Sequence, residues 1–539
     1  MKLQIAGFAL AIAPLCSFAQ APAYPNGSYS QTCTGISVSA NSLKATCRKL
    51  NGNTQPTVLD ELSTCLNSIA RYGDIGNIDG NLVCIPDLPK PDPAFTFPAA
   101  EVTINQWVFG GNMDAIHRHG WEIFAGLTHP VGVVDGTPVR AFETWATPRN
   151  MIFRMGQNGV LKFAVESTAG GKQSGLDLEI PRQFSAIKAA RKPKILSAQE
   201  VAASPVGDTN IFVAVSYNPP AAQHAIANKL FLRSTLDALL REGYAELPDF
   251  PANSITLKPV YKVIPASTPG GIYTFPGWPG PPNPVIAFPE EAWGACVYVD
   301  IKGSGAGGNS IDSGCKGRNA SNTFFLNNFV HQKISKENAD FLNAQLGLRN
   351  RYKEGDYAIL VAMHVTSREV KTWTWQSFWW SANPDQPYLP SSAAIAAQRP
   401  MAFLDDATRH YAMTVAYSMV TPAQPITGGQ SVGEPVFGFN PHLEAGFDPS
   451  VFQTQVPIVT PSGPITTQYG VQSNCMTCHN QAMYNPRTDY QSDGGANRQT
   501  PYGADYYKAI NDPIFAGSLK LDFAWSIIGS MQPPPPPSK

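Results

Sequence analysis

Apolar side chains recur every three or four residues in several stretches of the chain, which is the spacing of one face of an α-helix. The pattern is clearest in residues 113–127 and in residues 228–243, where five leucines form one stripe. Residues 336–348 follow the same spacing, and Ser335 is the expected N-cap. We predict helices over these three ranges, around His410 and Met413, and along the apolar run from Leu519 to Ile527.

Other stretches alternate apolar and polar residues or form short apolar runs, as strands do. We predict strands over residues 102–109, 139–145, 254–264, 295–301 and 357–365. The stretch 371–380 holds four of the ten tryptophans, and we expect a strand and a corner that bury large side chains. Together these elements predict an α+β fold with a large antiparallel component.

Composition adds limits on size and partners. The chain has 539 residues, enough for two or three domains, and its 48 prolines and 45 glycines indicate many loops. The net charge of −1 gives no reason to expect a nucleic acid as partner. No apolar run reaches the ~20 residues of a membrane span, so we expect none.

The first residues have the pattern of a secretory signal peptide. Lys2 supplies a positive charge, residues 5–15 form a short apolar core, and residues 17–19 are a cleavage site with small residues. We therefore predict a signal peptide at 1–19 and a periplasmic or secreted mature protein. Cys16 falls within the peptide that is removed.

Cysteine usage agrees with export. Of the nine cysteines, six remain after Cys16 and a Cys-x-x-Cys pair at 475 and 478 are set aside. An even number in an exported chain indicates disulfides. Proximity along the chain suggests Cys33–Cys47, Cys65–Cys84 and Cys296–Cys315, although one pair could instead be free and buried.

Residues Cys475-Met476-Thr477-Cys478-His479 spell C-x-x-C-H, the attachment sequence of c-type haem. Two thiols at this spacing can form thioethers with the two vinyl groups of the porphyrin, and the adjoining histidine is then an axial ligand of iron. The alternatives are a thioredoxin-like dithiol and half of a zinc site. No strand pattern precedes Asn474, and no further Cys or His cluster lies nearby, so we favour covalent haem c with its iron on His479.

The sixth iron ligand is left open by the sequence. Only a short segment follows His479, so we expect it to pack onto the central domain, which then supplies the distal wall. The absence of a second C-x-x-C-H argues against the di-haem peroxidases. The candidate ligands, besides none at all, are His364, His410, Met413, His442 and Met531.

Residues 26–84 contain short strand patterns separated by Asn-Gly and Asp-Gly turns. The opening Ser30-Gln31-Thr32-Cys33, the spacing to Cys47, and the closing Asn77-Ile78-Asp79-Gly80-Asn81-Leu82 resemble one repeat of the cyanovirin-N homology family of β-rich lectins. The family has two such repeats, whereas this chain has one, with an insertion at residues 66–74. The resemblance implies glycan contacts by Gln31, Thr32, Asn77 and Asp79. The alternative is that Asn77 and Asp79 serve only the turn.

The predicted organisation follows from these features. It comprises a signal peptide at 1–19, a cyanovirin-like all-β module at 26–85, a Pro-rich linker at 86–99, a central α+β domain at 100–455, a haem-binding segment at 456–532 and a Pro-rich tail at 533–539. In the central domain His117, His119 and His129 suggest a metal cluster, but on a helix His117 and His119 diverge, which favours structural or solvent-facing roles. No hydrolase, metalloprotease, P-loop or dinucleotide motif is present, so the catalytic residues stay unknown, and any chemistry would be carried by the haem.

The favoured function is an exported mono-haem c-type cytochrome that exchanges single electrons with a redox partner protein or a small electron carrier. The lectin-like module would attach it to a glycan or polysaccharide. One alternative is a haem peroxidase or oxygenase with an open distal site, in which the Trp-rich stretch contacts a polymer-derived substrate. Another is a carbohydrate-binding protein with a structural or sensory haem.

Overall fold

The computed structural model describes residues 24–25, 27–49, 52–68, 74–85, 88–156, 178, 210–282, 287–346, 348, 350–423, 433–446, 458–460, 463–465, 474–488 and 507–531. The predicted signal peptide and Pro-rich tail lie outside the described residues. Helices and strands are mixed, and nearly all described strand pairs are antiparallel, so the α+β prediction is confirmed. In this part of the chain, no helix is both long and apolar enough to cross a membrane.

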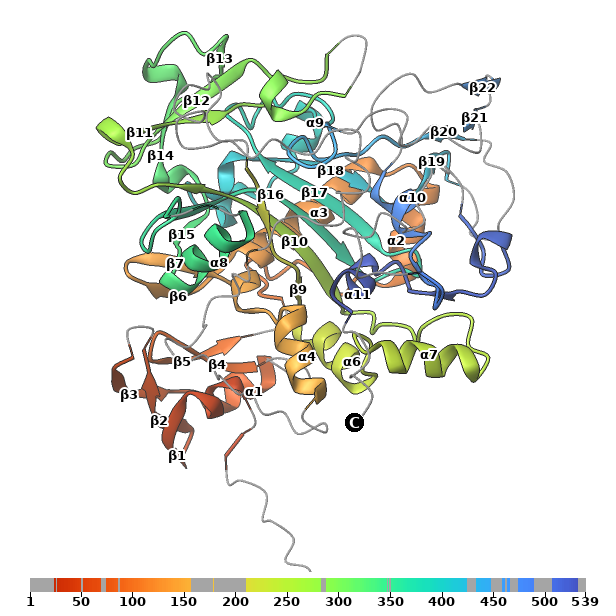
Figure 1. Cartoon of the computed structure of the whole chain (residues 1–539), viewed down its shortest axis with the longest axis horizontal. Helices are drawn as coiled ribbons and strands as arrows, with labels where there is room; N and C mark the ends of the chain where they lie inside the picture. The colour runs from red at the N-terminus through yellow and green to blue at the C-terminus, as the bar shows by residue number, and fades with distance from the viewer. Residues whose placement is uncertain are drawn as a thin grey trace, which may run out of the picture.

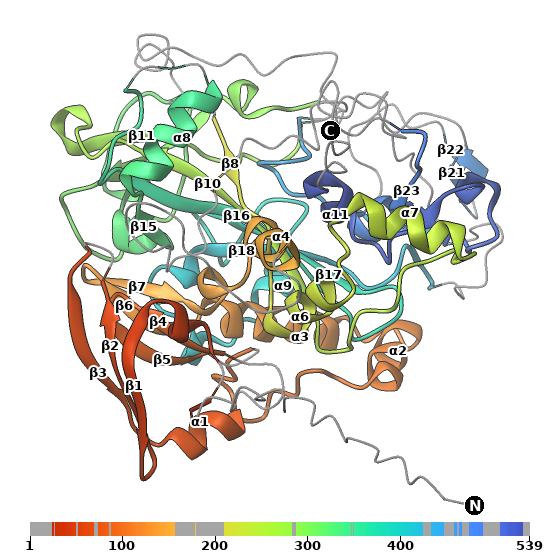
Figure 2. The ribbon, with the colours of Figure 1, turned by 60° about the horizontal axis from the view of Figure 1, so that its bottom comes forward.

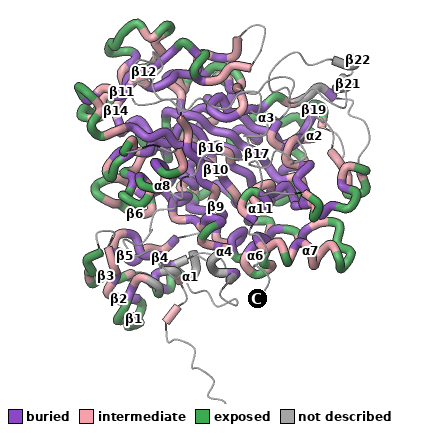
Figure 3. Tube along the Cα trace, viewed as in Figure 1, coloured by how far each residue is buried: buried purple, intermediate pink, exposed green. Residues whose placement is uncertain are grey.

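A seven-stranded sheet forms the centre of the described structure (Figure 1). Its main path is β18 (Tyr411–Ala416), β17 (Thr374–Trp380), β16 (Tyr357–Ser367), β10 (Ile255–Ile264) and β8 (Phe212–Val213), with β15 (His331–Lys333) on β16 and β9 (Ser216–Tyr217) on β10. Nearly every residue of β16, β17 and β18 is buried, as Figure 3 shows along the middle of the molecule. Strands buried on both faces have continuous apolar runs, which is why strands were predicted in the sequence at β16 and β17.

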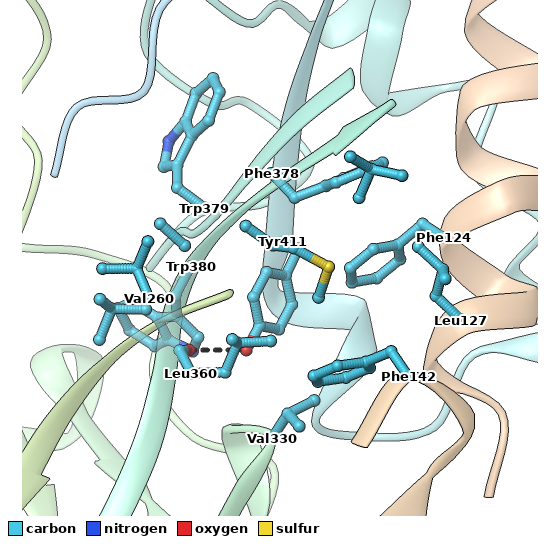
Figure 4. Close-up of a cluster of buried hydrophobic side chains, with 14 of the residues drawn as sticks. Phe124, Leu127, Phe142, Val260, Val330, Leu360, Phe378, Trp379, Trp380 and Tyr411 are labelled. Atoms are coloured by element: carbon cyan, nitrogen blue, oxygen red, sulfur yellow. Dashed lines mark hydrogen bonds between the residues drawn. The ribbon is translucent and has the colours of Figure 1, made fainter. Parts of the chain in front are cut away.

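The helix α3 (Met113–Thr128) packs on one face of this sheet. Its Phe124 stacks on Phe378 of β17 with ring centroids 4.5 Å apart, in the cluster drawn in Figure 4. Gly120 permits this close approach, because a Cβ there would lie 2.9 Å from the Met413 sulfur. Side chains at Phe378 and Met413 therefore point toward α3, and their strand neighbours point to the opposite face.

The opposite face carries a second apolar cluster built by C-terminal elements. It includes Trp373, Trp375, Met476 and Phe523, and it is contributed by β17, α10 (Cys475–His479) and the segment before α11 (Trp525–Ser530). The helices α4 (Pro148–Gly156), α6 (Pro219–Ala227) and α7 (Arg233–Arg241) pack in the same cluster, with the short hairpin of β23 (Met483–Tyr484) and β24 (Leu519–Lys520). The sheet thus separates α3 from α10.

The N-terminal module lies at one end of the molecule, away from α7 and α11 (Figure 2). It consists of the sheet β1 (Cys33–Ser39), β2 (Ser42–Arg48) and β3 (Thr54–Leu59), the helix α1 (Leu62–Ser68) and the hairpin β4 (Asp74–Ile78) and β5 (Asn81–Ile85). The disulfides Cys33–Cys47 and Cys65–Cys84 close it. The third predicted disulfide, Cys296–Cys315, lies in the sheet of β11 (Ile272–Pro276), β12 (Ala295–Asp300), β13 (Asp312–Ser313) and β14 (Thr323–Phe325). All three pairings are confirmed.

The remaining elements connect these parts. They are α2 (Glu101–Phe109), β6 (Pro130–Val134), β7 (Thr137–Arg140), α8 (Lys336–Leu346), α9 (Ala393–Ala396), β19 (Val420–Thr421), β20 (Glu434–Pro435), β21 (Ile458–Thr460) and β22 (Gly463–Ile465). Ser335 accepts a hydrogen bond from the Asn338 amide, so the predicted cap of α8 is confirmed.

Four predicted elements differ from the structure. Residues 102–109 are not a strand but the helix α2, because Ile104, Trp107 and Val108 share a helical face toward the core. In the range 139–145, predicted as a strand, β7 ends at Arg140 and a 3-10 turn follows. Helices were also predicted wrongly around His410 and Met413, which belong to a 3-10 turn and β18, and along residues 519–527, which begin as β24.

Two further predictions need adjustment. The helix predicted at 228–243 begins only at Arg233, after a turn that follows α6. In the predicted linker, Leu88, Phe95 and Phe97 are buried in the core of the central domain. The proline-rich segment is therefore a packed part of that core where it is described.

Candidate functional site

The Cys-x-x-Cys-His sequence forms the short helix α10, whose start is held by Asn474. The Asn474 side-chain oxygen accepts a hydrogen bond from the Thr477 amide at 3.3 Å, as an N-cap does. Its side-chain nitrogen donates to the carbonyls of Met419 and Val436, at 3.2 and 2.8 Å. One asparagine therefore starts the helix and ties it to the chain beyond β18. Residues three apart are neighbours on a helix surface, so the two thiols lie on one side of α10.

Cys475 and Cys478 are unpaired and half-buried, whereas the other six described cysteines form disulfides. Burial, followed by the negative charge of Glu444, raises the pKa of both thiols, and that of Cys478 reaches about 12. Redox-active Cys-x-x-Cys dithiols have a lowered thiol pKa instead. This environment argues against a thioredoxin-like dithiol, and it keeps two reduced thiols next to each other.

The imidazole of His479 is held by two distant parts of the chain. Its Nδ1 lies 2.7 Å from the Phe523 carbonyl oxygen, so Nδ1 carries the proton and donates it. The ring lies against that of Trp375, with centroids 4.4 Å apart. Burial lowers the pKa of His479 to about 4, which leaves the ring neutral at neutral pH. Among the described residues Nε2 has no hydrogen-bond partner, so its lone pair is free for a metal.

A second imidazole, that of His364 on β16, lies near α10. Its Nε2 is 2.9 Å from the Glu444 carboxylate. Glu444 follows a turn that Asn440 fixes to β17 by donating to the Ser377 hydroxyl and the Phe378 carbonyl, each at 2.9 Å. Ser377 pairs with His364 across the two strands, so the turn lies over the sheet face that carries His364.

The charge of Glu444 links this second imidazole to the motif. Burial alone would raise its pKa, but the charge and hydrogen bond of His364, the Asn440 amide and the charge of Lys258 together lower it. Lys258 is the residue opposite His364 on β10. The His364 and Glu444 charges in turn act on the pKa of His479, after the larger effects of burial and the Phe523 hydrogen bond. The pair is thus close enough to α10 for its charges to act on His479.

Polar atoms near the motif lack partners among the described residues. Asn480 follows His479 and is 1% exposed, yet neither its side-chain oxygen nor its nitrogen makes a hydrogen bond. The Nδ1 of His364 is likewise buried and unpaired. Buried polar groups are nearly always satisfied, so we expect partners for these atoms beyond the described residues.

These features fit a covalently attached haem. Cys475 and Cys478 provide two reduced thiols, His479 provides a neutral nitrogen with fixed orientation, and Asn480 provides unpaired polar atoms. The described residues contain no group of three or more His, Cys, Asp or Glu side chains that could hold a metal ion by themselves. A structural zinc needs four such ligands, whereas a haem iron takes one or two from the protein.

The predicted sixth ligands fall in different places. Met413 points toward α3, on the far side of the sheet from α10. His410 stacks on Trp380, a side chain of that same far face, and His442 is bonded to Glu290. Met531 follows α11, on the segment whose Phe523 carbonyl binds Nδ1 of His479. His364 is the candidate whose charge reaches His479.

The four residues predicted to contact a glycan have different surroundings in the N-terminal module. The Asn77 side chain donates to Thr32 Oγ1 and to the Arg48 carbonyl, each at 2.9 Å, and accepts from the Gly80 amide. Thr32 and Asn77 therefore hold the β4–β5 turn to the start of β1. Asp79 is half-buried in this turn with a positive φ of 45°, and Gln31 ends the 3-10 turn before β1.

The three histidines near α3 form no metal cluster in the described structure. His119 is 3% exposed, with Nδ1 2.6 Å from the Tyr417 hydroxyl and Nε2 3.1 Å from Glu369. It also borders a shallow pocket of about 360 Å³ with Trp107 and Glu122, on the α3 side of the sheet and away from α10. Both ring nitrogens of His119 are thus within hydrogen-bond distance of protein groups, which agrees with a structural role for this histidine.

Sequence reasoning did not identify Phe523, Glu444, Lys258 or Asn480 as site residues. Phe523 acts through its backbone carbonyl, which no side-chain pattern reveals. Glu444 had a weak signal, because it lies two residues after His442 in a short polar turn. Asn480 directly follows the motif, and only its burial distinguishes it.

Comparisons with known proteins return no relative: no family model, no curated protein and no solved structure matches this chain.

Proposed function

We propose that this chain is an exported c-type cytochrome that carries one haem on Cys475, Cys478 and His479 and transfers single electrons. The observation that carries the proposal is the arrangement of His479. Its Nδ1 is fixed by the Phe523 carbonyl, its ring lies on Trp375, and its Nε2 has no partner among the described residues, in a helix that also carries two free thiols. Metal-binding histidines are oriented in this way, with the second ring nitrogen bound to an oxygen.

The chain's own residues prepare this site. Asn474 sets the direction of α10 and so the positions of both thiols. Phe523 fixes the tautomer of His479, and Trp375 prevents the ring from turning away. The bound haem would supply the one-electron change between ferric and ferrous iron.

Export is supported by the three disulfides, which are typical of oxidising compartments. Glycan binding by the N-terminal module stays a prediction, and the electron-transfer proposal does not depend on it. Two of its four predicted contact residues already bond to each other.

The test is expression of the full chain together with haem-attachment machinery, followed by mass spectrometry of the denatured protein. We expect one covalent haem per chain, retained after acid–acetone extraction. Cys475→Ser with Cys478→Ser should abolish it, while Met476→Leu, a matched change inside the same helix, should not. A wild-type chain without covalent haem would overturn the proposal.

Electron transfer is tested separately by voltammetry of the purified haem protein. A reversible one-electron wave and slow reaction with hydrogen peroxide are expected. Rapid turnover of peroxide with an electron donor would instead identify a peroxidase.

A further inference from the structure

His364 and His479 project over the same face of the central sheet. His364 on β16 pairs with Ser377 on β17, and Trp375 is two residues from Ser377 on that strand. Side chains two apart along a strand share a face, as do paired residues. Trp375 contacts the His479 ring at 4.4 Å between centroids. His364 is therefore a diagonal neighbour of the residue on which His479 rests.

The two imidazoles have the same bonding pattern. In His479 one nitrogen bonds to the Phe523 carbonyl, and the other has no hydrogen-bond partner among the described residues. In His364 Nε2 bonds to Glu444 at 2.9 Å, while Nδ1 is buried without a partner in the described structure. A carboxylate on one ring nitrogen is the usual second contact of a metal-binding histidine, since it fixes the ring and increases its basicity.

Glu444 is itself held in place. Its second oxygen accepts a hydrogen bond from the Asn440 amide at 2.6 Å, and Asn440 is bonded to β17. Lys258, opposite His364 on β10, adds a positive charge that favours the carboxylate. The position of His364 is thus determined by three strands and one turn.

We propose that His364 is the second axial ligand of the iron, through the ring nitrogen that Glu444 leaves free, and that Glu444 is its positioning residue. This inference rests on the proposed function, because it requires the haem on Cys475, Cys478 and His479. It predicts a six-coordinate, low-spin iron with two histidine ligands.

The experiment is electron paramagnetic resonance and absorption spectroscopy of the oxidised full-length haem protein. Wild type should be low-spin with a bis-histidine signature. His364→Gly should convert nearly all of it to a high-spin form, and added imidazole should restore the low-spin signal, which also shows that the variant is folded. His410→Gly, a matched removal of a buried histidine that stacks on Trp380, should stay low-spin.

Glu444→Gln tests the positioning role through the reduction potential. It should keep the low-spin signal and raise the midpoint potential, because a less basic imidazole stabilises ferric iron less. An unchanged potential would overturn the role of Glu444.

The possible failures are separable. Covalent haem with a high-spin wild type, or with a His364→Gly variant that stays low-spin without imidazole, overturns this inference and leaves the haem proposal intact. A wild type without covalent haem overturns both.

Discussion

Nδ1 of His479 lies 2.7 Å from the carbonyl oxygen of Phe523, a residue 44 positions further along the chain. A carbonyl oxygen can only accept, so this contact requires the proton on Nδ1 and leaves the lone pair on Nε2. The backbone between β24 and α11 therefore decides which nitrogen of His479 keeps its lone pair.

Trp375 is the support of that histidine, and its removal should weaken the site and the fold together. It is 3% exposed, and its indole nitrogen donates to the Thr372 carbonyl. Trp375→Ala should lower the free energy of unfolding by about 3–5 kcal/mol, since it leaves a large cavity in the C-terminal cluster. Guanidinium unfolding measures this loss. Trp375→Phe keeps a ring against His479 and should lose clearly less; equal losses for both variants would contradict a supporting role.

Asn474 combines two functions that substitutions can separate. Asn474→Ala removes the N-cap of α10, worth about 1–2 kcal/mol, and leaves the carbonyls of Met419 and Val436 without their donor. Asn474→Ser keeps a capping oxygen but cannot reach both carbonyls. We expect Ala to be less stable than Ser, and Ser less stable than wild type, in urea unfolding. The fraction of chains with covalent haem should follow the same order, because α10 presents the thiols.

Glu143 should make stability depend on pH. Burial raises its pKa to about 7, against the hydrogen bonds that it accepts from the Arg140 amide and the Gln332 side chain. The folded state therefore binds a proton more tightly than the unfolded chain, whose Glu pKa is about 4.3. The stabilisation is complete below that value and is lost as the pH rises through about 7, by roughly 4 kcal/mol in all.

Glu143→Gln cannot titrate, which isolates this effect. The stability difference between wild type and Glu143→Gln should shift in favour of the variant by roughly 3 kcal/mol between about pH 4.5 and about pH 8.5. Unfolding free energies at both pH values provide the measurement. The exposed Glu291→Gln should show no such shift, and a pH-independent difference for Glu143→Gln would refute the prediction.

The His119 network should be structural. His119 bonds to Tyr417 and Glu369, and Glu369 also accepts from the Ala99 amide and the Ser367 hydroxyl. His119→Phe leaves a buried carboxylate without one of its donors and should cost about 3–5 kcal/mol in thermal or denaturant unfolding. His119→Gln can still donate and should cost less. A spectrum of the haem that changes with His119→Phe while stability does not would contradict a purely structural role.

Local sequence patterns correctly predicted the elements whose apolar residues are buried in a regular order along the element. The helix at 113–127 and the strands at 254–264 and 357–365 were found because their apolar periodicity reflects a fixed burial, and α3, β10 and β16 agree closely. The strand prediction at 102–109 was wrong because β-branched residues there are typical of strands. The segment is the helix α2, which packs against α3. The helix expected around His410 and Met413 failed because buried strands lack a period that separates them from helices.

The sequence by itself determined the Cys-x-x-Cys-His pattern and the three disulfides, because thiol and imidazole chemistry requires particular residues at short spacing. Only the tertiary structure decided that Trp375, His364, Glu444 and Phe523 meet at the motif. They come from two strands, one turn and a C-terminal segment. Their contacts depend on the register of the sheet and on how segments far apart in the sequence pack together. One of them acts through its backbone, which carries no residue-specific pattern.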